Sequence, residues 1–258
     1  MTLDLGWWDL ALIVVVSLQG TLLAYLPAPK WKAFLVSLPV PFTLSSLALG
    51  KPVSAQNVLG LVLLLFFALA VRWLHQGARL HITAAIALAA LGYCGSGTLL
   101  VGVVPETPLM FWLSALGVIG LGIWLLITMP HRKEPDYRSP LPVWLKLPVM
   151  MGVILFIVVI KEALQGFMTV FPMMTTVGAY ESRRSLWTLV RQMPVVMVTL
   201  TPMMIACRLS QPWVGQGLSL VVGWAVFLSI FLPLTRYLWS RAAAEAQADL
   251  LLSAEKVV

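Results

Sequence analysis

The amino-acid sequence predicts an all-α polytopic membrane protein on three observations. Hydrophobic residues make up 60% of the 258 residues and charged residues only 10%, which is more apolar surface than one soluble core can bury. The apolar runs are long enough to cross a bilayer as helices, because about 20 residues at 1.5 Å per residue span its hydrocarbon core. They also lack the alternating pattern that is typical of membrane barrel strands.

The chain contains nine candidate membrane spans. They cover residues 8-27, 33-49, 55-73, 81-104, 108-129, 143-164, 167-180, 187-207 and 213-238. The spans 33-49 and 167-180 are short and are interrupted by Pro39 and Pro172. Each of them either crosses the membrane as a broken helix or enters and returns on the same side.

The basic residues predict how the chain is oriented. With nine crossings and the N-terminus outside, all of the 17 Lys and Arg residues except Lys51, Lys161 and Arg208 lie on the cytoplasmic side. The positive-inside rule therefore favours a multi-pass protein of the cell inner (cytoplasmic) membrane with a cytoplasmic C-terminus. The opening "MTLDLGWWDL" lacks the basic region of a secretory signal, so the first span is expected to be retained. Anionic membrane lipids, rather than nucleic acid, are the expected partners of the +7 net charge.

An internal repeat is predicted from the two short spans. Aligning "FLVSLPVPFTLSSLALG" (34-50) with "FMTVFPMMTTVGAYESR" (167-183) pairs Phe34 with Phe167, Pro39 with Pro172 and Thr43 with Thr176. Each short span follows one full-length span and is followed by two further full-length spans. In the predicted topology, the two short spans enter the membrane from opposite sides. We therefore expect two inverted four-helix repeats. The expected units are the first repeat (1-104), a linking helix with a basic cytoplasmic loop (105-142), the second repeat (143-240) and a cytoplasmic tail (241-258).

The second unit resembles a known family. The stretch "IKEALQGFMTVFPMMTTVGAYESRRSLWTLVRQMPVVMVTLTPMM" is similar to the GlpM-like family of small four-helix inner-membrane proteins. The matching positions are Lys161, Phe171 with Pro172, Arg183 or Arg184, Val190 with Arg191, and Pro202. The family's "LR" dipeptide is "VR" here, and the resemblance covers less than half of the chain. It implies a fused, two-unit version of a module able to pair with an inverted copy of itself, and it implies no defined activity.

A solute or ion pathway is predicted at the two proline breaks. Proline removes a backbone N–H and leaves carbonyls that protein, water or solute must satisfy at that depth. Half-helices that meet from opposite sides would direct partial positive charge toward an anion. The alternative is that each proline only kinks its helix and each threonine bonds its own backbone. The predicted pathway residues are Lys161, Glu162, Pro39, Thr43, Pro172, Thr175 and Thr176.

Two groups of charged residues have a functional and a structural interpretation. Lys161 and Glu162 either line the pathway or lie in the outer interface, where lysine extends its charge to the headgroups. Glu181, Arg183, Arg184 and Arg191 either form an inner gate or only fix the topology.

Several chemistries have no support in the sequence. Cys94 and Cys207 are too few for a zinc cluster or a disulfide framework, and the histidines lack metal-site spacing. There is no P-loop and no hydrolase or dinucleotide motif. We therefore expect no enzyme activity, no metal and no cofactor.

The function predicted from these features is secondary transport of a small anionic solute, coupled, if at all, to protons or sodium. The alternative is a non-transporting membrane subunit or lipid-handling factor in cell-envelope assembly, and a channel is a third possibility. The sequence is compatible both with a homo-oligomer and with a protein partner in the cell envelope.

Overall fold

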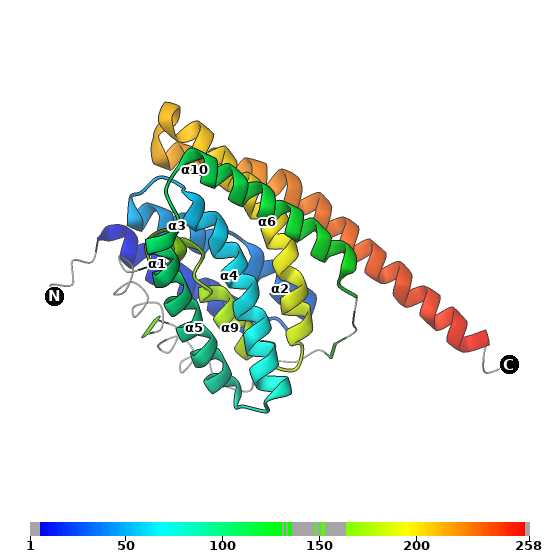
Figure 1. Cartoon of the computed structure of the whole chain (residues 1–258). Helices are drawn as coiled ribbons and strands as arrows, with labels where there is room; N and C mark the ends of the chain where they lie inside the picture. The colour runs from blue at the N-terminus through cyan, green and yellow to red at the C-terminus, as the bar shows by residue number, and fades with distance from the viewer. Residues whose placement is uncertain are drawn as a thin grey trace.

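The structure is a computed structural model, and it describes residues 6–130, 132, 134–135, 148, 151–152 and 164–255, with side chains up to residue 244 (Figure 1). Every element of this part of the chain is helical. The elements are α1 (Trp7–Tyr25), α2 (Pro29–Ser37), α3 (Val40–Leu49), α4 (Ala55–Arg72), η1 (Trp73–Gly77), α5 (Ile82–Val103), α6 (Pro108–Thr128), η2 (Gln165–Val170), α9 (Met173–Glu181) and α10 (Leu186–Glu255).

Six of the described helical segments are long and apolar enough to span a membrane. They are Trp7–Tyr25, Pro29–Leu49, Ala55–Gly77, Ile82–Val103, Pro108–Thr128 and Leu186–Ala244. Large apolar side chains remain exposed on them, such as Ile127 at 78% and Trp213 at 87%, which water would disfavour but lipid accommodates. The all-α class is thereby confirmed, and the helices are those expected of a membrane protein.

The nine predicted crossings and the inverted repeats are not confirmed, for three local reasons. The span 143-164 lies almost entirely outside the described residues. The span 167-180 is divided into η2, of six residues, and α9, of nine residues, and neither alone crosses a bilayer. The last two predicted spans are the two arms of α10, which turns at Gly215.

The turn in α10 requires a glycine. Gly215 has φ 75° and ψ 173°, a backbone conformation that side-chain-bearing residues rarely adopt. The arms before and after it pack closely, because a Cβ on Gly223 would lie 2.4 Å from Cys207 Sγ. The second arm continues as a helix and projects beyond the rest of the bundle near the C-terminus (Figure 1).

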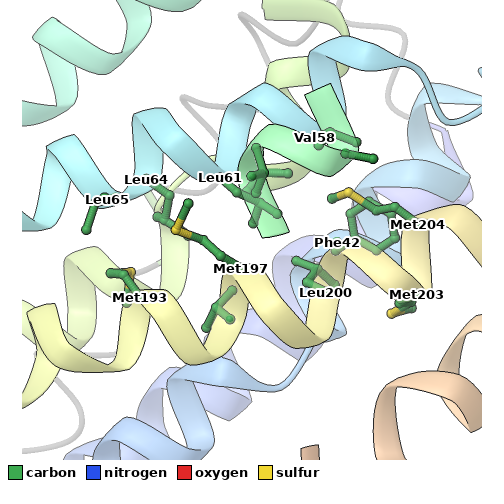
Figure 2. Packing of buried hydrophobic residues seen from close by; sticks show 14 of the residues in the cluster. Phe42, Val58, Leu61, Leu64, Leu65, Met193, Met197, Leu200, Met203 and Met204 are labelled. Carbon is green, nitrogen blue, oxygen red and sulfur yellow. The ribbon is translucent and has the colours of Figure 1, made fainter. Parts of the chain in front are cut away.

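The core lies where α4 packs against the first arm of α10. Figure 2 shows Leu61 and Leu64 of α4 facing Met197 and Leu200 of α10, with Phe42 of α3 beside them. All five side chains are buried. Further methionines of the first arm of α10 are buried in the same cluster, where flexible side chains fit irregular gaps.

The connections lie at two opposite ends of the bundle. At one end, Gln216 Nε2 donates to Ser46 O (2.6 Å) and Arg208 Nη1 donates to Val53 O (2.7 Å). We call this the Lys51 end, because the loop between α3 and α4 contains Lys51. At the other end, which we call the basic end, the guanidinium groups of Arg72 and Arg132 lie 4.5 and 4.9 Å from the centre of the Trp187 ring system.

Cysteine labelling tests which end is cytoplasmic. In a background with Cys94→Ala and Cys207→Ala, we expect Lys51→Cys and Glu106→Cys to react with an impermeant reagent outside intact cells, and Gln76→Cys to react only after lysis. The reason is that basic ends are retained in the cytoplasm. Labelling of Gln76→Cys in intact cells would reverse the orientation, and protection of Lys51→Cys alone would contradict the topology of the first unit.

Candidate functional site: a cavity between two broken helices

The two proline-containing segments break with the same local structure. Leu38 is extended (φ −65°, ψ 130°) and Pro39 (φ −78°, ψ 31°) starts α3. Phe171 is likewise extended (φ −52°, ψ 138°) and Pro172 (φ −71°, ψ 44°) starts α9. The backbone therefore changes course at the position where the sequence alignment pairs the two prolines.

The threonines paired by the alignment close the first turn after each break. Thr43 N and Oγ1 both donate to Pro39 O, at 2.9 and 2.8 Å. Thr176 N and Oγ1 donate to Pro172 O, at 2.7 and 2.6 Å. Thr43 Oγ1 also accepts a hydrogen bond from Trp224 Nε1. These hydroxyls satisfy backbone carbonyls of their own segments, which is a structural role.

A cavity of about 50 Å³ lies between the breaks. Its walls include Ser37, Leu38 and Pro39 from the first break and Thr169, Val170 and Phe171 from the second. Leu64 of α4 and Leu200 of α10 also line it. A space of this size holds only a few water-sized groups, so the site as it stands fits only a very small occupant.

Both half-helices begin at this cavity without a side-chain cap. Neither α3 nor α9 has a side-chain hydrogen bond to its first turn. Pro41 has no N–H and Met173 N donates to Phe171 O (2.6 Å), whereas the other first N–H groups have no partner within their helix. Phe42 of α3 and Met174 of α9 line the cavity. The positive ends of two helix dipoles therefore lie at one site, and none of the side chains that the structure places on its walls is acidic.

Thr175 is the predicted pathway residue whose hydroxyl remains available. It is 3% exposed and lines the cavity. Among the described residues, its hydroxyl makes no hydrogen bond, in contrast to that of the adjacent Thr176. This hydroxyl can donate a hydrogen bond to an occupant of the cavity, so Thr175 is the predicted pathway residue best placed to bind one.

Side chains from neighbouring helices hold the irregular backbone on both sides of the cavity. Pro39 has no N–H for the carbonyl of Leu35, and Gln19 Nε2 donates to that carbonyl at 2.9 Å. Around η2, Tyr93 OH donates to Phe167 O (2.8 Å) and Gln56 Oε1 accepts from Gly166 N (3.2 Å). These bonds satisfy backbone groups that lipid could not.

Asn57 is the central residue of this support. Its Nδ2 donates to Gly166 O (3.1 Å) and Thr169 Oγ1 (2.8 Å), while its Oδ1 accepts from Ser54 N at the start of α4 (2.6 Å). It is 3% exposed. One amide therefore links the N-terminus of α4 to the wall of the cavity.

Replacing Asn57 is expected to destabilise the protein. Asn57→Ala would leave the buried N–H of Ser54 without its partner, at a cost of about 1 to 3 kcal/mol, while Gly166 O would keep the hydrogen bond from Thr169 Oγ1. Thermal unfolding in detergent should show a clear fall in Tm. Gln76→Ala, at an exposed position, is the control and should change stability by less than about 0.5 kcal/mol. Equal effects of the two substitutions would contradict the assigned role of Asn57.

Lys32 is a candidate functional residue that the sequence analysis placed in a loop. It lies in α2, is 1% exposed, and its Nζ donates to Glu181 O at the C-terminus of α9 (2.7 Å). A cation is favoured there by the negative end of the helix dipole. The side chain of Glu181 is also 1% exposed. Pro29 is the sequence signal that could have placed Lys32 in a helix. Proline favours the first position of a helix, and α2 begins at Pro29 and includes Lys32.

The contribution of the Lys32 contact to stability can be tested by comparing substitutions of two lysines of α2. Lys32→Ala should lower the free energy of unfolding by about 1.5 to 3 kcal/mol, the contribution of a hydrogen bond to a charged group. Lys30→Ala removes the same charge from an exposed position two residues earlier, so its effect on Tm should be small. If both variants unfold at the same temperature, Lys32 does not stabilise the end of α9.

The other predicted residues lie in different places. Lys161 and Glu162 lie outside the described residues. Arg183 and Arg184 line an open cavity of about 340 Å³ with His75 and His81, and Arg191 lines a separate one. The inner gate of Glu181, Arg183, Arg184 and Arg191 stays a prediction.

Comparison of the chain with protein-family models, with curated proteins and with solved structures finds no match. The resemblance of the second unit to the GlpM-like family therefore stays a prediction. The class that the fold supports is an all-α membrane protein.

Proposed function

We propose that the chain is a secondary transporter of a small anionic solute and that the cavity between the two breaks is the solute site. The observation that carries the proposal is that two uncapped half-helices, distant in the sequence, begin at one cavity. Discontinuous helices with N-termini at a shared site are a common way for transporters to bind anionic groups.

The electrostatics of the cavity favour an anion. Each helix N-terminus is equivalent to roughly half a positive charge, and the surrounding apolar walls weaken that field less than water would. The Thr175 hydroxyl can donate a hydrogen bond to the same occupant. A cation would meet the opposite field, with no acidic side chain among the described walls to offset it.

Alternating access follows from the two equivalent breaks. In the proposed nine-crossing topology the two repeats are inverted, so exchanging their conformations opens the cavity first to one side and then to the other. The short segments on each side of Pro39 and Pro172 can rotate as units about the breaks. The contact between Lys32 and the end of α9 closes the route toward the basic end. Protons or sodium would supply the energy, and Lys161 and Glu162 would lie on the outer route.

A thermal-shift screen tests the solute site. Purified wild type is unfolded with and without small inorganic and organic anions at two pH values. A bound anion should raise the stability by about 2.7 kcal/mol at a hundred times its Kd. Thr175→Val preserves shape and removes the available hydroxyl, so the shift should decrease, whereas Thr176→Val should retain it because that hydroxyl bonds Pro172 O.

Uptake measurements separate transport from binding. Proteoliposomes containing wild type should accumulate the anion found in the screen, with saturation and with dependence on an imposed gradient. Conductance without saturation would indicate a channel. The transport proposal fails if no anion of the panel shifts Tm or accumulates. Stable co-purification of a partner would then favour the envelope-assembly alternative.

A further inference from the structure

Two cavities at the basic end share a wall and differ in chemistry. The first, of about 90 Å³, is lined by the cationic side chains Lys30, Arg132 and Arg191. The second, of about 370 Å³, is lined mainly by apolar side chains, including Trp31, Phe34 and Leu232, with Arg236 as the one charged residue among the described residues that line it. Trp239 and Thr235, from the second arm of α10, line both cavities. Together they form a site that is cationic at one end and apolar at the other.

Trp239 separates the two parts. Lys30 Nζ lies 5.7 Å from the centre of the Trp239 ring system on the side of the cationic cavity. Trp31 and Phe34, which line the apolar cavity, have their ring centroids 4.8 and 6.0 Å from it. Tryptophan with one polar and one apolar neighbourhood is typical of the membrane–water interface, so the shared wall fits the depth at which a lipid headgroup meets its acyl chains.

Thr235 provides a second, independent indication of a ligand. It is 6% exposed, and its buried hydroxyl has no hydrogen-bond partner among the residues that the structure describes. Five other buried hydroxyls among the described residues also have no partner, those of Ser17, Ser45, Ser46, Ser114 and Thr201. Thr235 differs from them because it lines both of these cavities. Because Thr235 lines both cavities, an occupant that extends from one into the other passes beside this hydroxyl.

The acidic side chain of Glu134 does not line the cationic cavity. Its Oε1 accepts from Trp187 N (3.1 Å), and its Oε2 accepts from Thr188 N and Thr188 Oγ1 (both 2.6 Å). The carboxylate thus caps the N-terminus of α10. A capped helix start at the edge of the cavity keeps the position of Arg191, one turn further along α10, well defined.

We propose that this pair of cavities binds one anionic phospholipid. The phosphate group contacts Lys30, Arg132 and Arg191, and one acyl chain lies along Trp31, Phe34 and Leu232. Charge complementarity selects an anionic headgroup, and the adjoining apolar groove selects a lipid over a soluble phosphate. The site is separate from the solute cavity, so its occupancy can be measured whether or not the protein transports an anion.

Native mass spectrometry of the purified full chain tests the proposal. The detergent-solubilised protein is titrated with phosphatidylglycerol and with phosphatidylcholine that have the same acyl chains. We expect a saturable phosphatidylglycerol adduct and a weaker one with phosphatidylcholine. Lys30→Gln combined with Arg191→Gln should weaken phosphatidylglycerol binding at least about tenfold, because each change removes a charge-assisted contact. Lys51→Gln combined with Arg241→Gln, an equal charge change outside both cavities, should leave binding of this lipid unchanged.

Thr235→Val is a second test variant, which applies if the Lys30→Gln and Arg191→Gln double variant folds poorly. Valine preserves shape and removes a hydroxyl that has no partner among the described residues, so Tm without lipid should not fall while phosphatidylglycerol binding should weaken several-fold. Equal binding of both lipids, or unchanged affinity in Thr235→Val and Lys30→Gln, would overturn the proposal. Displacement of bound phosphatidylglycerol by millimolar inorganic phosphate alone would also overturn it, by showing a simple phosphate site without lipid selectivity.

Discussion

The need to satisfy backbone polar groups at two helix breaks governs the arrangement of this fold. A continuous helix satisfies its own N–H and C=O groups, whereas a break inside an apolar bundle requires donors and acceptors from elsewhere. Gln19 reaches across to Leu35 O, and Asn57 and Tyr93 reach the backbone of η2. Each of these polar side chains lies on an otherwise apolar helix, and each bonds the backbone of another segment beside a break.

This requirement also limits how the helices pack around the site. Gly166 must lie against α4, because a Cβ there would be 2.8 Å from Gln56 Cβ. Gly178 of α9 lies equally close to α2, where an added Cβ would be 2.9 Å from Val36 Cγ2. The two broken segments are therefore held by close backbone contacts as well as by hydrogen bonds. Bulky side chains at either glycine would separate the walls on which the cavity depends.

The sequence was sufficient to predict the helical class and the location of both breaks. Apolar runs predict membrane helices by length, and Pro39 and Pro172 interrupt a helix for stereochemical reasons that hold in any context. The alignment also paired Thr43 with Thr176, which make the same bonds. The sequence could not distinguish Thr175 from Thr176, because adjacent threonines differ only in the direction each side chain takes from the helix. Lys32 was missed because a lysine beside a predicted loop is ordinarily solvated, and its burial depends on α9, which follows it by more than a hundred residues.

The second arm of α10 has a mechanical consequence. It continues as an unbroken helix to Glu255, beyond Trp239, and Figure 1 shows its end extending past the other helices. At 1.5 Å per residue, the part after Trp239 is a rod roughly 24 Å long. Because Thr235 and Trp239 belong to the same rod, a sideways load on its free end acts as a torque on the wall between the cationic and apolar cavities.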